Sequence, residues 1–239
     1  MRVLSFSEKG CIRKNNEDSF LVLSAEGLYA VADGMGGHRA GEVASSVALH
    51  ELEMWAPRLE GLDDHALENE LTKAFIQANR VVHESSITEP ENAGMGTTLT
   101  VLLIRNEKVV IAHVGDSRAY LWRNEMLTPL TMDHSLVGEL VRLGQISLEE
   151  AKKHPQRNVL MRAIGADPAI EVDCRSIALQ SNDVFLLCTD GFSNMISDEE
   201  LTEEFLEPSS WEERLEKLRQ LTLERGAPDN FTALCCIME

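Results

Sequence analysis

The sequence predicts an α+β fold, in which antiparallel strands form the sheets and the helices pack in layers of their own. Three observations lead to this class. Short apolar runs rich in Val, Leu and Ile recur along the chain, bounded by Gly, Asp or Asn. Two amphipathic helical patterns lie between the first of these runs and the later ones. The regular alternation of strand and helix that marks a parallel sheet is absent.

The predicted strands are short, and most of their residues are apolar. They cover residues 19–23, 27–32, 97–104, 109–114, 119–122, 183–188 and 231–238. Only four residues, Arg105 to Lys108, separate two of these runs, and a connection of this length is typical of a β-hairpin. Apolar runs of this length between turn residues are consistent with buried strands.

Two amphipathic helices are predicted in the first half of the chain. One apolar stripe runs from Ala40 to Trp55 and stops before Pro57, and a second runs from Leu67 to Val82. A further helix is predicted at about 210–224. Each stripe needs an apolar surface to pack against, and the predicted sheets supply one.

We expect residues 1–239 to form one domain, because no repeat, low-complexity stretch or Gly/Ser/Pro-rich linker divides them. A segment at about 135–170 lies between two predicted strands and carries short helical patterns at 136–143 and 148–153. This segment is either a small flap or an ordinary surface loop with two helical turns.

The charge balance excludes one class of partner. The chain has 40 Asp and Glu against 22 Lys and Arg, a formal net charge of −18, and no basic stripe that would bind a nucleic-acid backbone. Its five cysteines show no CxxC spacing and three lie in apolar runs, so we expect free thiols. The absence of a signal peptide and of an apolar run of about 18 residues predicts a cytoplasmic protein without a membrane span.

Aspartates mark the ends of four predicted strands. They are Asp33, Asp116, Asp190 and Asp229. One Asp-Gly after a strand is an ordinary turn signal, but four carboxylates at one rim would raise each other's pKa unless cations neutralised them. A cluster with only Asp oxygens suits Mg²⁺ or Mn²⁺. Zinc is disfavoured, because the seven His show no HExxH and no His/Cys set has ligand spacing.

A second polar group lies at residues 13–18, Arg-Lys-Asn-Asn-Glu-Asp. Alone it is typical of a polar loop before a strand. Beside a rim of metal-binding carboxylates it offers an arginine for a phosphate group and further acids for metal-bound water. The glycines of 33–38 match neither the P-loop nor GxGxxG, which disfavours a nucleotide loop. They fit a backbone carbonyl turned towards a metal ion.

Six short motifs follow one another along the chain. They are residues 13–18, Asp33-Gly34-Met35-Gly36-Gly37, Gly96-Thr97-Thr98, Gly115-Asp116-Ser117-Arg118, Asp190-Gly191 and Asp229-Asn230. As an ordered set they resemble the metal-dependent Ser/Thr protein phosphatases of the PPM, or PP2C-like, family in its compact bacterial form. The resemblance implies a four-layer α-β-β-α sandwich: two stacked antiparallel sheets, helices on both outer faces, and metal ions at one rim beside a mobile flap.

The resemblance also implies a set of metal ligands. Asp33 corresponds to the aspartate that bridges two ions, and Gly34 to the glycine whose carbonyl binds one of them. Asp190 and Asp229 correspond to ligands of the second ion. Asp116, with Asp190 as its partner, corresponds to a ligand of a third, weaker ion. The expected cofactor is therefore Mn²⁺ or Mg²⁺, two ions at the core site and a third beside them.

Other residues are expected to support the reaction. Glu17 and Asp18 correspond to acids that hold metal-bound water or lie behind the ligands, and Arg13 to the phosphate-binding arginine. Two ions about 4 Å apart lower the pKa of a bridging water, so hydroxide would attack phosphorus directly. Animal-type members have a His directly after the Asp-Gly pair to protonate the leaving alcohol, where this chain has Met35. The nearby His38 is not assigned that role, which leaves a metal-bound water as the candidate.

The function implied by the resemblance is a Mn²⁺/Mg²⁺-dependent phosphatase of phosphoserine and phosphothreonine in proteins. It would oppose a bacterial Ser/Thr kinase, act on that kinase's substrates as a monomer, and depend on its flap for substrate choice and metal occupancy. Two alternatives stay open: an inactive relative that docks on phosphoproteins, and a phosphatase for a small molecule or a regulator of the anti-anti-sigma type. An inactive relative would be expected to lose metal aspartates, and this chain keeps them all.

Overall fold

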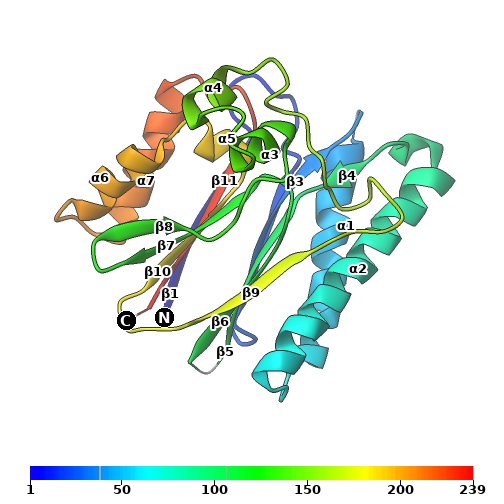
Figure 1. The fold of residues 1–239 in the computed structure, drawn as a ribbon, viewed down its shortest axis with the longest axis horizontal. Coiled ribbons are helices and arrows are strands. Elements are labelled where there is room, and N and C mark those ends of the chain that lie inside the picture. Colours follow the sequence, from blue (N-terminus) through cyan, green and yellow to red (C-terminus); the bar gives the residue numbers. More distant parts are fainter. Residues whose placement is uncertain (38, 106, 239) are drawn as a thin grey trace.

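Two antiparallel β-sheets lie face to face in the middle of the molecule, and helices cover the outer face of each (Figure 1). The computed structural model describes residues 1–37, 39–105 and 107–238, the side chains of residues 64 and 65 excepted. The α+β class and the four-layer order expected from the sequence are confirmed. No helix in these ranges is long and apolar enough to cross a membrane.

The first sheet has the strand order β1-β11-β10-β7-β8. Its strands are β1 (Arg2–Glu8), β7 (Arg118–Arg123), β8 (Met126–Pro129), β10 (Val184–Cys188) and β11 (Phe231–Ile237). The second sheet has the order β2-β3-β5-β6-β9, with β4 paired to the end of β3. Its strands are β2 (Asp18–Leu23), β3 (Leu28–Met35), β4 (Gly96–Thr97), β5 (Leu99–Arg105), β6 (Lys108–Val114) and β9 (Asp173–Ala178).

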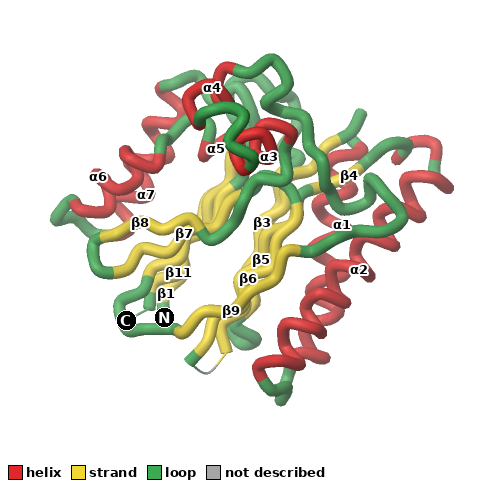
Figure 2. Tube along the Cα trace, in the orientation of Figure 1, coloured by secondary structure: helices red, strands yellow, loops and turns green. Residues whose placement is uncertain are grey.

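The helices form the two outer layers and part of a connection between the sheets (Figure 2). The second sheet is covered by α1 (Ala40–Trp55) and α2 (Asp64–Thr88), joined by the 3₁₀ turn η1 (Ala56–Leu59); η2 (Pro90–Asn92) follows α2. The first sheet is covered by α5 (Asp190–Ser193), α6 (Asp198–Leu206) and α7 (Trp211–Glu224). Two short helices, α3 (Leu136–Arg142) and α4 (Leu148–Lys153), lie between β8 and β9.

Strand alternation divides the apolar residues into three layers. Along β3, Leu28 and Ala30 pack among the residues of α1 and α2, while Tyr29 and Val31 pack against the other sheet. Successive side chains of a strand point to opposite faces, so a strand covered on both faces is apolar throughout. This is why the central strands stand out in the sequence as unbroken apolar runs.

The elements missed by the sequence analysis lie mainly at sheet edges. The strands β1, β8 and β9 each end a sheet, and their residues are mostly half-buried or exposed. An edge strand with one solvent-exposed face has no continuous apolar run, so the sequence does not reveal it clearly. The short acidic helix α6 was also missed, whereas α1 and α7 have the predicted positions and α2 is longer than predicted at both ends.

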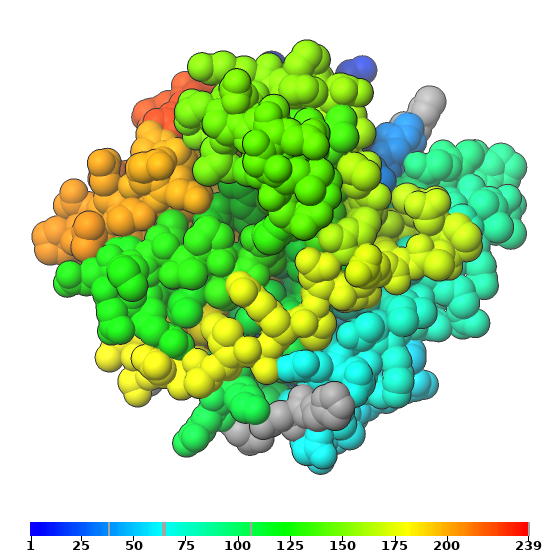
Figure 3. All heavy atoms as spheres, in the orientation of Figure 1, coloured from blue at the N-terminus to red at the C-terminus, as the bar shows by residue number. Residues whose placement is uncertain are grey.

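The segment predicted as a flap, residues 135–170, has the two helices expected from its pattern. Both of its ends are fixed. Ser135 pairs with Leu160 in an isolated bridge, and Ile164, which is fully buried, pairs with Thr97. The segment lies at the end of the molecule opposite the two chain termini (Figure 1), where its yellow-green atoms cover the surface above the strands (Figure 3).

Candidate metal and phosphate site

The four predicted aspartates are carried to the same rim by four different elements. Asp33 lies on β3, Asp190 is the first residue of α5 directly after β10, and Asp229 lies two residues before β11. Asp116 lies in the turn between β6 and β7. Because β3, β6 and β10 end here and β11 begins here, the antiparallel topology gathers residues that are far apart in sequence (Figure 1).

Asp33 differs from the sequence expectation in one respect. We predicted that the strand ends before the Asp-Gly pair, but β3 continues to Met35 because Gly34 and Met35 pair with Thr97 and Gly96 of β4. The Thr98 hydroxyl accepts a hydrogen bond from the Asp33 amide at 2.9 Å. The Gly-Thr-Thr motif therefore fixes the backbone of Asp33.

The carboxylates of this rim perturb one another strongly. The side chains of Asp33 and Asp190 are within hydrogen-bonding contact, and burial, followed by repulsion from Asp18 and Asp190, raises the pKa of Asp33 well above its ordinary value. Burial and then Asp229 raise the pKa of Asp190. Burial and then Asp190 raise the pKa of Asp116. Such a group is stable only when a proton or a cation lies between its members.

Gly34 and Gly41 allow two further oxygens to approach the rim. A Cβ on Gly34 would lie 2.0 Å from the carbonyl oxygen of Gly41, so the start of α1 rests directly on β3. A Cβ on Gly41 would lie 2.4 Å from Oε2 of Glu17 and 2.8 Å from the carbonyl oxygen of Gly34. Oε2 of Glu17 and the carbonyl oxygen of Gly34 therefore both lie close to the Cα of Gly41. The close packing around Gly34 and Gly41 leaves no room for a side chain at either position.

Asp18 lies beside Asp33, its partner in the β2–β3 register, and is almost completely buried. Its Oδ2 accepts hydrogen bonds of 2.8 Å from the hydroxyls of Thr189 and Thr232. Its Oδ1 has no hydrogen-bond partner among the described residues. Burial raises the pKa of Asp18 to about 7, against the two threonine hydrogen bonds. An unpartnered buried carboxylate oxygen is a group that a bound water or cation would satisfy.

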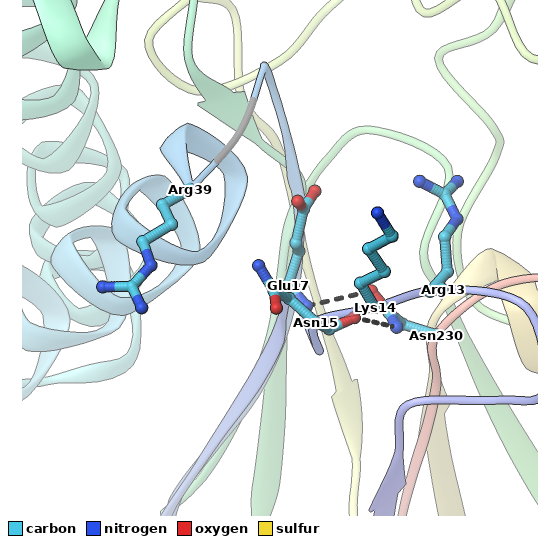
Figure 4. Close-up of a pocket in the computed structure, with 6 residues that line it drawn as sticks. All are labelled: Arg13, Lys14, Asn15, Glu17, Arg39 and Asn230. Carbon is cyan, nitrogen blue, oxygen red and sulfur yellow. Dashed lines mark hydrogen bonds between the residues drawn. The ribbon is translucent and has the colours of Figure 1, made fainter.

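Arg13 reaches the same rim from the loop between β1 and β2. Its Nη2 donates to Oδ2 of Asp229 at 2.7 Å, and half of its side chain remains exposed. Asn230, to which the sequence analysis gave no role, holds this loop in place. Its Oδ1 accepts from the Glu17 amide at 2.9 Å, and its Nδ2 donates to the carbonyl of Asn15 at 2.8 Å (Figure 4).

A pocket of about 450 Å³ opens beside this loop. It is lined by Arg13, Lys14, Asn15, Glu17, Arg39 and Asn230 (Figure 4). Three of the six lining residues are cationic, although the chain as a whole carries a net charge of −18. The pocket therefore suits an anionic group placed next to the carboxylate rim.

His134 is a second residue that the sequence analysis missed. It is buried, its amide donates to the Gly115 carbonyl at 2.7 Å, and its Nδ1 accepts from the Gly115 amide at 3.2 Å. The amide of Met161 donates to the His134 carbonyl at 2.7 Å. His134 thus connects the turn of Asp116 to both sides of the flap base. Only its place in a polar stretch after an apolar strand marks it in the sequence.

The donor set fits hard divalent cations. Among the described residues, no three His, Cys, Asp or Glu side chains already surround a common centre. Every candidate ligand is an oxygen, which matches Mg²⁺ or Mn²⁺. His38 lies outside the described residues, and Met35 has no ionisable group.

Known proteins are similar to this chain in sequence and in fold. The family model described as protein phosphatase 2C matches residues 2–231. The serine/threonine phosphatase stp of Listeria monocytogenes serotype 4b (strain F2365) is 40% identical over 232 residues, which cover 95% of this chain and 92% of that protein.

Two solved structures extend the comparison to three dimensions. The phosphatase Stp1 from Staphylococcus aureus superposes with a TM-score of 0.93 at 34% identity, covering 99% of this chain and 94% of that one. The catalytic domain of the phosphatase PstP in complex with 2 manganese ions gives a TM-score of 0.88 at 36% identity, covering 100% and 98%. The resemblance expected from the ordered motifs is confirmed, and the chain belongs to the protein phosphatase 2C family.

Proposed function

We propose that this protein is a metal-dependent phosphatase that hydrolyses phosphoserine and phosphothreonine in proteins. The observation that carries the proposal is an arginine-lined pocket directly beside a rim of oxygen ligands, in a chain of this family. The relatives compared above are named serine/threonine phosphatases, and one of their structures holds manganese. These names support the same reaction for this chain.

Arg13 binds and orients the phosphate group in this proposal. One edge of its guanidinium contacts Asp229, which fixes the plane of the group. The exposed N–H groups then face the pocket and can hold two phosphate oxygens in a fixed geometry. The positive charge lies where negative charge develops during the displacement.

The carboxylates hold the cations. We assign Asp33 as the residue shared by two ions, the Gly34 carbonyl as a ligand of one ion, and Asp190 and Asp229 as ligands of the other. When bound, the two ions supply an acidified water to attack phosphorus and positive charge to offset that of the phosphate group. Asp116 is proposed as a ligand of a third ion, together with Asp190.

Glu17 and Asp18 complete the site. Glu17 presents its carboxylate beside the Gly34 carbonyl, where it would accept hydrogen bonds from water held by bound ions. Oδ2 of Asp18 accepts hydrogen bonds from two threonine hydroxyls, and its Oδ1 has no hydrogen-bond partner among the described residues.

We further propose that the substrates are proteins phosphorylated by a Ser/Thr kinase that this enzyme opposes. The relatives' names support a protein substrate. A docking protein without activity would not need the complete carboxylate rim. A phosphatase for a small molecule is the remaining alternative, and the choice of substrate in the assay below distinguishes it.

The test is phosphate release from a phosphothreonine peptide. We expect turnover with Mn²⁺, loss of turnover with EDTA, and restoration by added Mn²⁺. Asp33→Asn should lower kcat by more than about 100-fold, the upper range for residues that only support metal ligands. Glu53→Gln, at an exposed acid on α1, is the matched control and should keep full activity.

Two results would contradict the proposal. Activity that survives both EDTA and Asp33→Asn would exclude metal-dependent hydrolysis at this rim. Hydrolysis of small phosphate esters without hydrolysis of any phosphopeptide would instead favour the small-molecule alternative.

A further inference from the structure

The pocket beside Arg13 contains two cations that the proposed reaction does not use. Lys14 follows Arg13 in the loop between β1 and β2, and Arg39 directly precedes α1. Both side chains are exposed, and neither makes a hydrogen bond or ion pair with another residue that the structure describes. In Figure 4 Lys14 extends in the same direction as Arg13, and Arg39 lies on the other side of Glu17.

Many other cations of this acidic chain are neutralised by carboxylates. Arg118 donates to Asp133 at 2.8 and 2.9 Å, and Arg123 donates to Asp183 at 2.7 Å. Lys14 and Arg39 have no such carboxylate partner among the described residues, and they line the pocket on opposite sides of Glu17 (Figure 4). Unpaired cations at a concave surface raise the local concentration of anions, and here they do so within a chain of net charge −18.

The size of the pocket exceeds the need of one phosphate group. A volume of about 450 Å³ is within the range of about 300–1,000 Å³ that accommodates a whole small-molecule ligand. Arg13 lies on one side of Glu17 and Arg39 on the other (Figure 4). Space therefore remains for a neighbouring group of the substrate, next to Lys14 and Arg39.

We propose that Lys14 and Arg39 form a second anion subsite, which binds a negatively charged group beside the phosphorylated residue of the substrate. The bound group is a carboxylate or a second phosphate. This inference rests on the proposed function, and it narrows the substrate class to phosphoproteins with an acidic or doubly phosphorylated segment.

Removing either cation should raise KM modestly, because the subsite contributes to substrate binding. Pairs between exposed charges are weak and are screened by salt, so each cation should change KM by about 2- to 5-fold at low ionic strength. The effect should fall as salt is added, because these charges act mainly on association and orientation. The kcat should change little, since neither side chain contacts the reacting phosphate.

The experiment compares three phosphothreonine peptides that differ only at the flanking position. The flanking residue is Ala, Glu, or a non-hydrolysable phosphonate analogue of phosphothreonine. The wild-type protein, with Mn²⁺, should show a KM several-fold lower for the two anionic peptides than for the Ala peptide. The comparison of the Glu and phosphonate peptides separates the two sources of charge.

The variants are Lys14→Gln, Arg39→Gln and the double variant, with Arg80→Gln as a charge-matched control on the exposed face of α2. In the double variant the KM values of the three peptides should converge, whereas the control should keep the wild-type ratio. Equal KM values in the wild-type protein, or a ratio that survives the double variant, would overturn the subsite and leave the phosphatase assignment intact. Failure to hydrolyse any of the peptides or p-nitrophenyl phosphate would overturn both.

Discussion

Single residues of this site are constrained by contacts that exclude even one methyl group. A Cβ on Gly34 would lie 2.0 Å from the Gly41 carbonyl oxygen, and a Cβ on Gly191 would lie 1.9 Å from the Asn230 carbonyl oxygen. In both cases the obstacle is backbone, which cannot rotate away as a side chain can. The two glycines therefore allow neighbouring elements to approach more closely than any other residue would.

Gly34→Ala should therefore destabilise the protein. The added methyl group forces β3 and α1 apart, and overpacking of this kind costs about 1–3 kcal/mol. Urea unfolding at neutral pH in EDTA measures the change without a contribution from bound metal.

The control for this substitution is Gly37→Ala. An added Cβ at Gly37 meets no atom within 4 Å, so the free energy of unfolding should change by less than about 0.5 kcal/mol. Equal stability of Gly34→Ala and Gly37→Ala would contradict the close approach of α1 to β3.

At the scale of elements, the flap is joined to the sheet sandwich at few points. Its exit is fixed by Ile164 and by Gly165, whose amide donates to the Asn79 side chain of α2 at 2.7 Å. Its base is fixed by the backbone of His134. Between these points α3 and α4 bury few apolar residues, so the flap can change conformation without opening a core.

Deletion of residues 140–160, replaced by a short Gly-Ser linker, should leave a folded protein. The anchors at His134 and Ile164 lie outside the deleted segment, and the three apolar clusters contain no residue from it. We expect KM for a phosphoprotein to rise by several-fold, with a smaller change for p-nitrophenyl phosphate. Circular dichroism checks the fold, and unchanged kinetics on the phosphoprotein would show that the flap has no part in substrate choice.

The sequence predicted elements best where both faces are covered. The unbroken apolar runs of β3, β6 and β11 reflect a sandwich with helices outside, and their positions were predicted to within a few residues. The strands β1 and β9 alternate only weakly because they lie at sheet edges, so periodicity alone does not reveal them. The pairing of β1 with β11 joins strands from the two ends of the chain, so it depends on the tertiary fold and not on a local pattern.

At the scale of the whole molecule, charge is distributed unevenly. The chain carries a net charge of −18, yet its candidate site combines a half-buried carboxylate rim with a cationic pocket. Two divalent ions at the rim would add four positive charges and reverse the local field. A phosphate dianion is then attracted to a strongly acidic protein.

Mn²⁺ should consequently stabilise the folded protein. Binding to the native state alone adds about 2.7 kcal/mol for each site at a concentration one hundred times Kd. The midpoint of thermal unfolding should rise with Mn²⁺ and return to its starting value with EDTA.

Asp33→Asn distinguishes specific binding from a general effect of the ion. This variant should lose most of the Mn²⁺-dependent shift, while Glu53→Gln should keep it. If Asp33→Asn responds to Mn²⁺ as the wild-type protein does, the stabilising ions bind elsewhere.

The gathering of these aspartates at one rim could be predicted from the sequence, but the residues that hold the neighbouring loops in place could not. Asp33, Asp190 and Asp229 each adjoin an apolar run, which made them visible. His134 and Asn230 act through backbone contacts with residues far away in the chain, and no local pattern marks such contacts. The pairing of Arg13 with Asp229 likewise depends on contact between the N-terminal and C-terminal parts of the chain.

That pairing has a consequence for the order of folding. Arg13 and Asp229 are 216 positions apart, and β1 pairs along its whole length with β11. Contacts of such long range form slowly, because a long loop must close before they contribute. During synthesis β1 has no partner until β11 leaves the ribosome. Arg13 and its carboxylate partner Asp229 therefore meet only after both sheets can form, so a partly made chain lacks the candidate site.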